Sequence, residues 1–100
     1  PRLKSQSLST PMSATIFPNP SSNRSWLNLA IRHKSSLEIT VIDAIGRHVY
    51  QQSIVDLIAG EHRLELPSDE WSDGHYNVMV QAMNEDGVVL KRNLRLQKRP

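Results

Sequence analysis

Hydrophobic and polar residues alternate along most of the chain with a period of two. The alternation is clear in residues 27–32, 37–42, 63–66, 76–81 and 94–97. This period is typical of a β-strand that turns one face to a core and the other to solvent. No stretch of about ten residues or more shows a helical period, and the nearest candidate, Ile54 to Ile58, is short and β-branched.

Two four-residue segments punctuate the alternation, and each of them ends in glycine. Asp43-Ala44-Ile45-Gly46 and Asn84-Glu85-Asp86-Gly87 both lie between alternating segments, which predicts hairpins with a type I turn and a left-handed glycine. Pro18 and Pro20 would interrupt a central strand, so we expect the segment around Phe17 at a sheet edge or a strand end.

The pattern as a whole predicts an all-β fold. About seven short strands, with turns at spacings of roughly 8–12 residues, are typical of an antiparallel β-sandwich of immunoglobulin-like architecture. We expect one core, which includes Leu29, Ile39, Val41, Leu64, Tyr76, Val78 and Leu90.

The first residues differ in composition from the rest. Residues 1–13 are rich in Ser and Pro and show no periodicity, so we interpret them as a linker that precedes a single domain at 14–100. The chain starts at Pro1 rather than at a methionine, so we expect it to be a piece of a longer polypeptide.

Composition narrows the classes of protein that remain. The hydrophobic fraction of 38% suffices for one modest core, and no apolar run is long enough to span a membrane. Cysteine is absent, which excludes disulfides, zinc–thiolate sites and thiol nucleophiles.

Residues typical of catalysis or metal binding do not form a recognised pattern. The histidines are His33, His48, His62 and His75, and their spacing fits no metal motif. Asp73 and His75 are two residues apart, but we expect both to face solvent in a turn. No Ser lies in a G-x-S-x-G elbow, and the glycines are isolated. We therefore expect no catalytic residue, no metal and no cofactor in this domain. This expectation concerns the domain alone and leaves open whether its parent protein is an enzyme.

The tryptophans and the basic residues near the end of the chain are the remaining candidates for binding. Trp26 is expected to point away from the core, either as a sugar-binding platform or as a cover for the rim, and Trp71 to plug one open end of the sandwich. Lys91 to Pro100 contain five basic residues and no acid. This segment could attract an anionic partner such as a lipopolysaccharide phosphate, whereas nucleic acid is disfavoured because no aromatic residue is present for base stacking.

Four motifs, in this order, resemble one family. They are Ile16-Phe17-Pro18-Asn19-Pro20, Asp43-Ala44-Ile45-Gly46-Arg47, Gly74-His75-Tyr76-Asn77-Val78-Met79-Val80 and the basic-apolar stretch from Lys91 to Lys98. Together they resemble the C-terminal sorting domain of the bacterial type IX secretion system. Phe17 replaces a usual Tyr, and Arg99-Pro100 extend beyond the usual final basic residue.

The motif residues also carry structural expectations of their own. Asp43 should accept hydrogen bonds from N–H groups of its turn, and Arg47 should bond back to Asp43 or to nearby carbonyls. Gly74 should let the preceding crossover approach the sheet, and Tyr76 should enter the core with its hydroxyl at the rim.

The resemblance implies a function in protein transport. Such domains direct their parent protein through the outer-membrane translocon to the cell surface or into the medium. The implied partners are the translocon and its shuttle proteins, a surface signal peptidase that usually removes the domain, and anionic lipopolysaccharide. One alternative is a retained adhesive or scaffolding module, including a component of the secretion machinery, that binds surface lipopolysaccharide or glycan. Another is a glycan-binding module of a secreted hydrolase that depends on Trp26.

Recognition is expected on the last strand. Leu90, Leu94 and Leu96 should face the core, and the polar residues between them should face solvent. The residues expected to contact the translocon are Lys91, Arg95, Gln97 and Lys98. Cleavage is expected between Ser5 and Ala14, where side chains are small.

Overall fold

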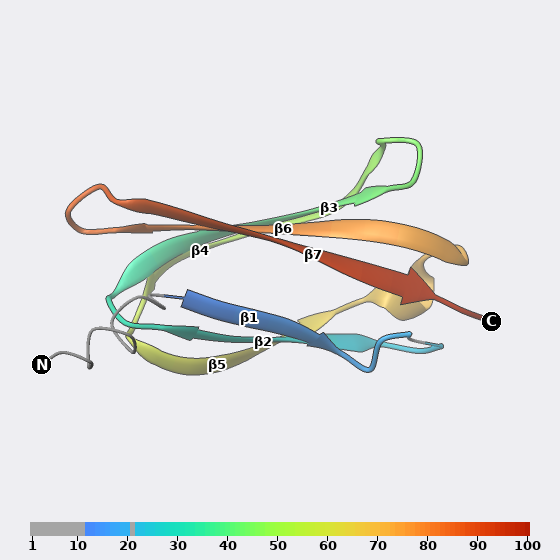
Figure 1. Ribbon diagram of the computed structural model, residues 1–100, viewed down its shortest axis with the longest axis horizontal. Helices are drawn as coiled ribbons and strands as arrows, with labels where there is room; N and C mark the ends of the chain where they lie inside the picture. Colours follow the sequence, from blue (N-terminus) through green and yellow to red (C-terminus); the bar gives the residue numbers. More distant parts are fainter. Residues whose placement is uncertain (1–11, 21) are drawn as a thin grey trace, which may run out of the picture.

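Seven strands and one short 3-10 helix make up the protein (Figure 1). The computed structural model describes residues 12–20 and 22–100. The elements are β1 (Met12–Phe17), β2 (Ser25–Ile31), β3 (Ser35–Asp43), β4 (His48–Leu57), β5 (Gly60–Leu66), η1 (Ser68–Glu70), β6 (Gly74–Asn84) and β7 (Val89–Lys98). The predicted all-β fold is confirmed.

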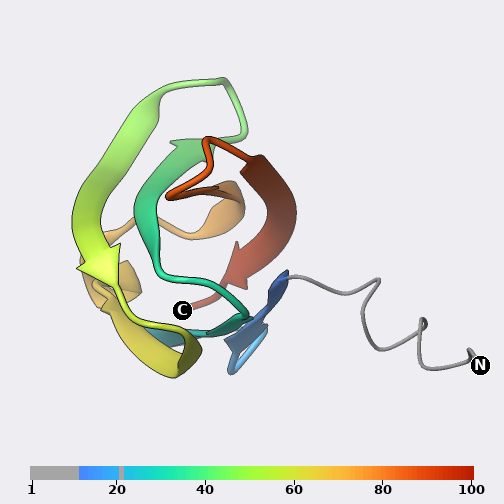
Figure 2. The same ribbon diagram turned by 90° about the vertical axis from the view of Figure 1, so that its left-hand side faces the viewer.

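The strands form two antiparallel sheets that pack face to face. One sheet has the order β1-β2-β5 and the other the order β4-β3-β6-β7. Because β2 pairs with β5 and β3 with β6, the chain crosses three times between the sheets, after β2, after β4 and after β5, as in an immunoglobulin-like sandwich. Figure 2, which looks along the sandwich, shows β4 and β7 on opposite sides of the molecule.

The core lies between the two sheets and follows the predicted alternation. Leu29, Ile39, Val41, Tyr76 and Val78 are buried, as expected. Leu64 and Leu90 are half-buried and pack against this core. Burial of a side chain of this size contributes about 1.5–3 kcal/mol, so the shared core holds the two sheets together.

Both predicted glycine turns are confirmed. Gly46 has φ +89° and Gly87 has φ +82°, a backbone conformation that side chains with a Cβ rarely adopt. In each turn, the glycine N–H donates to the carbonyl of the first turn residue, Asp43 or Asn84, at 3.0 Å.

The first strand begins earlier than the predicted domain start at residue 14. Met12 is only 1% exposed and pairs with Ile31, so residues 12 and 13 belong to the sandwich. The rest of the predicted linker, residues 1–11, lies outside the described residues. The strand ends at Phe17, directly before Pro18, and it lies at the edge of its sheet, as expected from the prolines.

Candidate functional site

Motif residues that are far apart in the sequence lie together at one end of the sandwich, here called the motif end. Tyr76 pairs with Asp43 on β3, and Gly74 pairs with Lys98 on β7. The end of β1, the turn after β3, the start of β6 and the end of β7 therefore meet at the right-hand side of Figure 1. Among the motif positions, Val78 lies deeper, fully buried in the core.

Asn19 joins the segment after β1 to the last strand. Its Nδ2 donates to the carbonyl of Arg95 at 2.6 Å, and its Oδ1 accepts from the N–H of Gln97 at 3.1 Å. Both of these backbone groups lie on the edge of β7 that faces away from β6. The amide of Asn19 therefore acts as a clamp, because it satisfies the strand edge in the way that a neighbouring strand would.

The turn after β3 is organised by Asp43, as expected. Asp43 Oδ1 accepts hydrogen bonds from the N–H groups of Ile45, at 3.1 Å, and Arg47, at 2.8 Å. Arg47 Nε donates to Asp43 Oδ2 at 2.9 Å. The bond from the backbone N–H of Arg47 and the nearby guanidinium stabilise the carboxylate and lower the pKa of Asp43.

Tyr76 joins the core to the loop that precedes its own strand. The ring is 5% exposed, and the hydroxyl donates to the carbonyl of Ser72, four residues upstream. A tyrosine near the start of this strand that bonds back to the upstream backbone is typical of immunoglobulin-like sandwiches. Burial raises the pKa of Tyr76, and the carboxylates of Asp43 and Asp73 raise it further.

Trp71 fills this end of the sandwich, as predicted. Its ring lies between Tyr50 and Tyr76, with centroid distances of 6.0 and 5.2 Å, and it packs against the core. The expectation for Gly74 was wrong, because a Cβ at this position would have no atom within 4 Å. Its φ of +146°, rather than a close approach of the crossover, explains the glycine.

The last strand exposes two of the predicted contact residues to solvent. Lys91 and Arg95 lie on the outer face of the four-stranded sheet, opposite Gln81 and Asn77. Gln97 is on the same face and half-buried. Leu96 is buried on the inner face, whereas Leu90 and Leu94 are half-buried there.

Lys98 departs from the expectation that it faces solvent with Lys91 and Arg95. It lies two residues after Leu96, so the alternation places it on the inner side, where it is 8% exposed. Its Nζ is 3.8 Å from Asp73 Oδ1, which ties the end of β7 to the loop before β6. Lys98 therefore does not share a surface with the other two cations.

Met79 lies between Lys91 and Arg95 on the outer face of this sheet. It pairs with Asn93 and is 36% exposed. Two shallow hollows share Met79 and Asn93 in their lining, and Lys91 borders one of them and Arg95 the other. This face thus combines two cations with an apolar centre.

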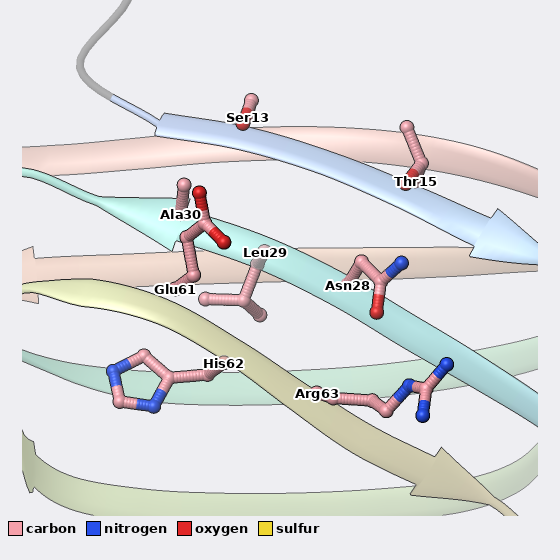
Figure 3. Close-up of a pocket in the computed structure, with 8 residues that line it drawn as sticks. All are labelled: Ser13, Thr15, Asn28, Leu29, Ala30, Glu61, His62 and Arg63. Carbon is pink, nitrogen blue, oxygen red and sulfur yellow. The ribbon is translucent and has the colours of Figure 1, made fainter.

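The outer face of the three-stranded sheet has a different character. A hollow on it is bordered by small and polar side chains from β1, β2 and β5, among them Thr15, Asn28 and Arg63 (Figure 3). The guanidinium of Arg63 lies 5.0 Å from the ring centre of Phe17 and 5.2 Å from that of Trp26. Trp26 therefore faces away from the core, but Arg63 covers it, so it is not an open platform.

Within residues 12–20 and 22–100, no group of three or more His, Asp or Glu side chains is placed to hold a metal ion. His62 Nε2 lies 2.7 Å from the carbonyl of Ile58. In the same described ranges, no helix is long and apolar enough to cross a membrane.

Two contacts were not anticipated from the sequence. The first is the clamp of Asn19 on β7. The second is a buried pair, in which Ser25 Oγ and Ser68 Oγ are 2.8 Å apart and Ser68 donates to the carbonyl of Asn23 at 2.6 Å. The only local signal for the serine pair is that Ser25 has the same parity as Leu27 and Leu29, which places it on the inner face of β2.

A comparison with protein families gives one match. The family model described as a secretion system C-terminal sorting domain matches residues 15–92, most of the chain. The matched range contains the first three motifs in full, and it stops within the fourth, before Arg95, Gln97 and Lys98. A comparison with curated proteins found no match. Since the match covers most of the chain, and the fold and the gathered motifs agree with it, the chain belongs to the type IX secretion C-terminal sorting domains, the signals that mark proteins for export to the cell surface or secretion.

Proposed function

We propose that the type IX translocon or its shuttle proteins recognise this sorting domain through the outer face of the four-stranded sheet. Lys91 and Arg95 make the main contacts, and Gln97 adds a polar contact beside them. A component that binds a folded domain contacts the residues that face outward, and charge complementarity sets the rate and specificity of such an encounter.

The observation that carries the proposal is that, in the described part of the chain, these two cations lie exposed on one sheet face without an ion pair, whereas most other cations of the strands and turns have a partner. Within the same described ranges, Arg63 and Arg92 form no ion pair either, but Arg63 lies over two aromatic rings and Arg92 donates to the carbonyl of Met12. Arg24, Lys34, Arg47 and Lys98 all form ion pairs with carboxylates. Among the described residues, neither Lys91 nor Arg95 has an ion-pair partner within 4.0 Å. Their charges are available to an anionic partner, and the exposed thioether of Met79 between them offers apolar contact.

Lys98 is assigned a supporting role. Its ion pair with Asp73 fixes the end of β7 against the loop before β6, and the clamp of Asn19 fixes the adjacent edge. These contacts position Arg95 and Gln97 without requiring Lys98 to contact the translocon.

The partners that act after export are proposed at the other end of the chain. A surface signal peptidase cleaves within the expected interval from Ser5 to Ala14, at a bond before Met12. A cut after Met12 would remove a buried residue from the domain, whereas a cut before it leaves β1 whole. The parent protein is then joined to anionic lipopolysaccharide, and the sorting domain contributes no catalytic group to either step.

The test is the export of a reporter fused to this chain. We compare wild type with a variant that carries Lys91→Glu and Arg95→Glu. The control carries Arg32→Glu and Lys34→Glu in the turn between β2 and β3, which changes the net charge by the same amount. Exposed charges contribute little to stability, so both variants should keep the wild-type melting temperature.

We expect the variant on β7 to lose about tenfold or more of the exported reporter, which corresponds to about 1.4 kcal/mol of binding, while the control is exported normally. Mass spectrometry of the exported reporter should place its new C-terminus before Met12. Equal export of the two charge-reversed variants would rule out recognition through Lys91 and Arg95.

A further inference from the structure

Strand β4 is the least protected edge of the sandwich. It lies at the end of the four-stranded sheet and contains no Lys, Arg or Pro in His48–Leu57. Native proteins usually protect such an edge with charges, prolines or a covering segment. The other edges show these devices, because Asn19 clamps β7, Pro18 directly follows β1, and β5 alternates charged residues.

The residues of β4 are arranged symmetrically about Gln52. Gln51 and Ser53 are polar and exposed on one face, and Tyr50 and Ile54 are half-buried on the other. Beyond this stretch, Val49 and Val55 are both exposed, and so are His48 and Asp56. An antiparallel pair of β4 strands centred on Gln52 would therefore set Tyr50 against Ile54 of the second copy and Gln51 against its Ser53.

The irregularities of the strand follow the same symmetry. In the pairing with β3, β4 has one extra residue between His48 and Tyr50, and another between Ile54 and Leu57. A regular stretch, Tyr50–Ile54, lies between these two bulges. Bulges at both ends confine any further pairing to this central stretch and so fix its register.

The clamp at Asn19 shows which backbone N–H and C=O groups of the four-stranded sheet point outward at its edges. Asn19 bonds the carbonyl of Arg95 and the N–H of Gln97, so the backbone groups of these two residues point away from β6. The N–H and C=O groups of Leu96, which lies between them, therefore point toward its partner Tyr76 on β6. The direction of the backbone N–H and C=O groups alternates from one residue to the next in each strand. Followed through the pairing of β6 with β3 and of β3 with β4, this alternation directs the N–H and C=O of Tyr50 toward β3.

The groups of Gln51 and Ser53 consequently point outward from the sheet. Among the described residues, no strand lies beyond this edge. In an antiparallel pair centred on Gln52, Gln51 would face Ser53 of the second copy, and the two residues would exchange both N–H···O bonds. The register in which the side chains of β4 match is therefore also the register in which its outward N–H and C=O groups can pair.

We propose that two copies of this domain associate through β4, antiparallel and centred on Gln52, into one continuous eight-stranded sheet. Because the regular stretch is short, the dimer depends on protein concentration. The two-fold axis is perpendicular to the sheet, so both outer faces point to the same side. If Lys91 and Arg95 contact the translocon, as proposed above, the dimer presents two such surfaces side by side and gains avidity.

The first test is sedimentation velocity of the 100-residue chain over a range of concentrations. Ser53→Pro removes an N–H that points away from β3, so it should block the dimer and leave the fold intact. Asn93→Pro is the matched control, because its N–H points away from β6 on the opposite edge of the same sheet. We expect Ser53→Pro to weaken association about tenfold or more and Asn93→Pro to leave it unchanged. A chain that stays monomeric throughout, or a dimer that tolerates Ser53→Pro, would overturn the proposal.

A further measurement keeps the test decisive if either proline variant fails to fold. Amide hydrogen exchange of wild type should show protection of Gln51 and Ser53 that increases with concentration, while Asn93 stays unchanged. Exchange at Gln51 and Ser53 that is independent of concentration would contradict the pairing through β4.

Discussion

The turn after β3 and the turn after β6 have the same backbone hydrogen bonds but differ in the charge of their first residue. In both, the N–H of the first residue donates to the carbonyl four residues later, from Asp43 to Arg47 at 2.9 Å and from Asn84 to Val88 at 3.0 Å. In both, a side-chain oxygen of that first residue accepts from the N–H groups two and four residues on. A short acceptor followed by glycine three residues later is therefore the feature that the two turns share.

What distinguishes the turn of Asp43 is its charge. Asp43 is a carboxylate paired with Arg47, whereas Asn84 is a neutral amide. Since Asn84 organises its turn as a neutral acceptor, the charges at Asp43 and Arg47 are not required for the backbone conformation. They lie at the motif end, beside Tyr76 and a hollow that Trp71 also borders, so they shape the surface where the family motifs gather.

The largest effect is expected when the glycines of both turns are changed. Gly46→Val and Gly87→Val should each lower the free energy of unfolding by ~1–3 kcal/mol, because a β-branched residue is strained at these positive φ angles. A Cβ would meet no atom within 4 Å at either site, so the cost comes from the backbone alone.

Chemical denaturation measures this cost, and Gly46→Asn is the control, because Asn tolerates the left-handed conformation better than Val. The two Val variants should agree within about 0.5 kcal/mol, the usual error for independent sites. A clear difference between them would show that the two turns contribute differently to stability although they share the same hydrogen bonds.

An intermediate effect is expected when the acceptor is removed. Asn84→Ala loses two hydrogen bonds to backbone N–H groups, and because water reaches this exposed turn, the net cost should be about 1 kcal/mol. Asp43→Ala loses the same two bonds and also the contact to Arg47, so it should be the more destabilised variant. Thermal melts of both variants check the order, and the reverse order would contradict any added stability from the ion pair.

The smallest effect concerns pH, and the exchange variants Asp43→Asn and Asn84→Asp isolate it. Folding lowers the pKa of Asp43, so its contribution to stability is present above the unfolded value of about 4 and is lost as the pH falls through the folded value. The difference in unfolding free energy between wild type and Asp43→Asn should therefore be largest near pH ~7 and shrink below about 4.

Denaturation at a series of pH values checks this, with Asn84→Asp as the counterpart that introduces a carboxylate into the neutral turn. A difference between wild type and Asp43→Asn that stayed constant down to pH ~2 would mean that the lowered pKa does not contribute to stability.

Much of the fold was predictable because alternation is a local property of the chain. Leu29, Ile39 and Val78 were assigned to the core from their neighbours alone, and all three are buried. The parity that placed them also assigns Lys98 to the inner side, but its charge was taken to mean exposure. Long side chains can bury their apolar stem while the ammonium meets a partner at the rim, and Lys98 does so with Asp73.

The features that were missed depend on residues far apart in the sequence. No pattern around Asn19 indicates that its amide bonds the backbone of Arg95, 76 residues away. Strand β4 was also poorly defined, because its exposed valines and its two bulges disturb the alternation. Its location at a sheet edge follows from the pairing of β3 and β6, which sequence periodicity does not contain.

The clamp of Asn19 also has a consequence for the order of events during synthesis. The amide belongs to a segment that is made early, and its two backbone partners belong to the strand that is made last among the seven. The motif end therefore reaches its final form only after Gln97 has been translated and β7 has been added to its sheet. A chain that stops short of β7 retains most of its motif residues but does not assemble the end where they meet. An export system that recognises this end would thereby select against incomplete or unfolded cargo without a separate inspection step.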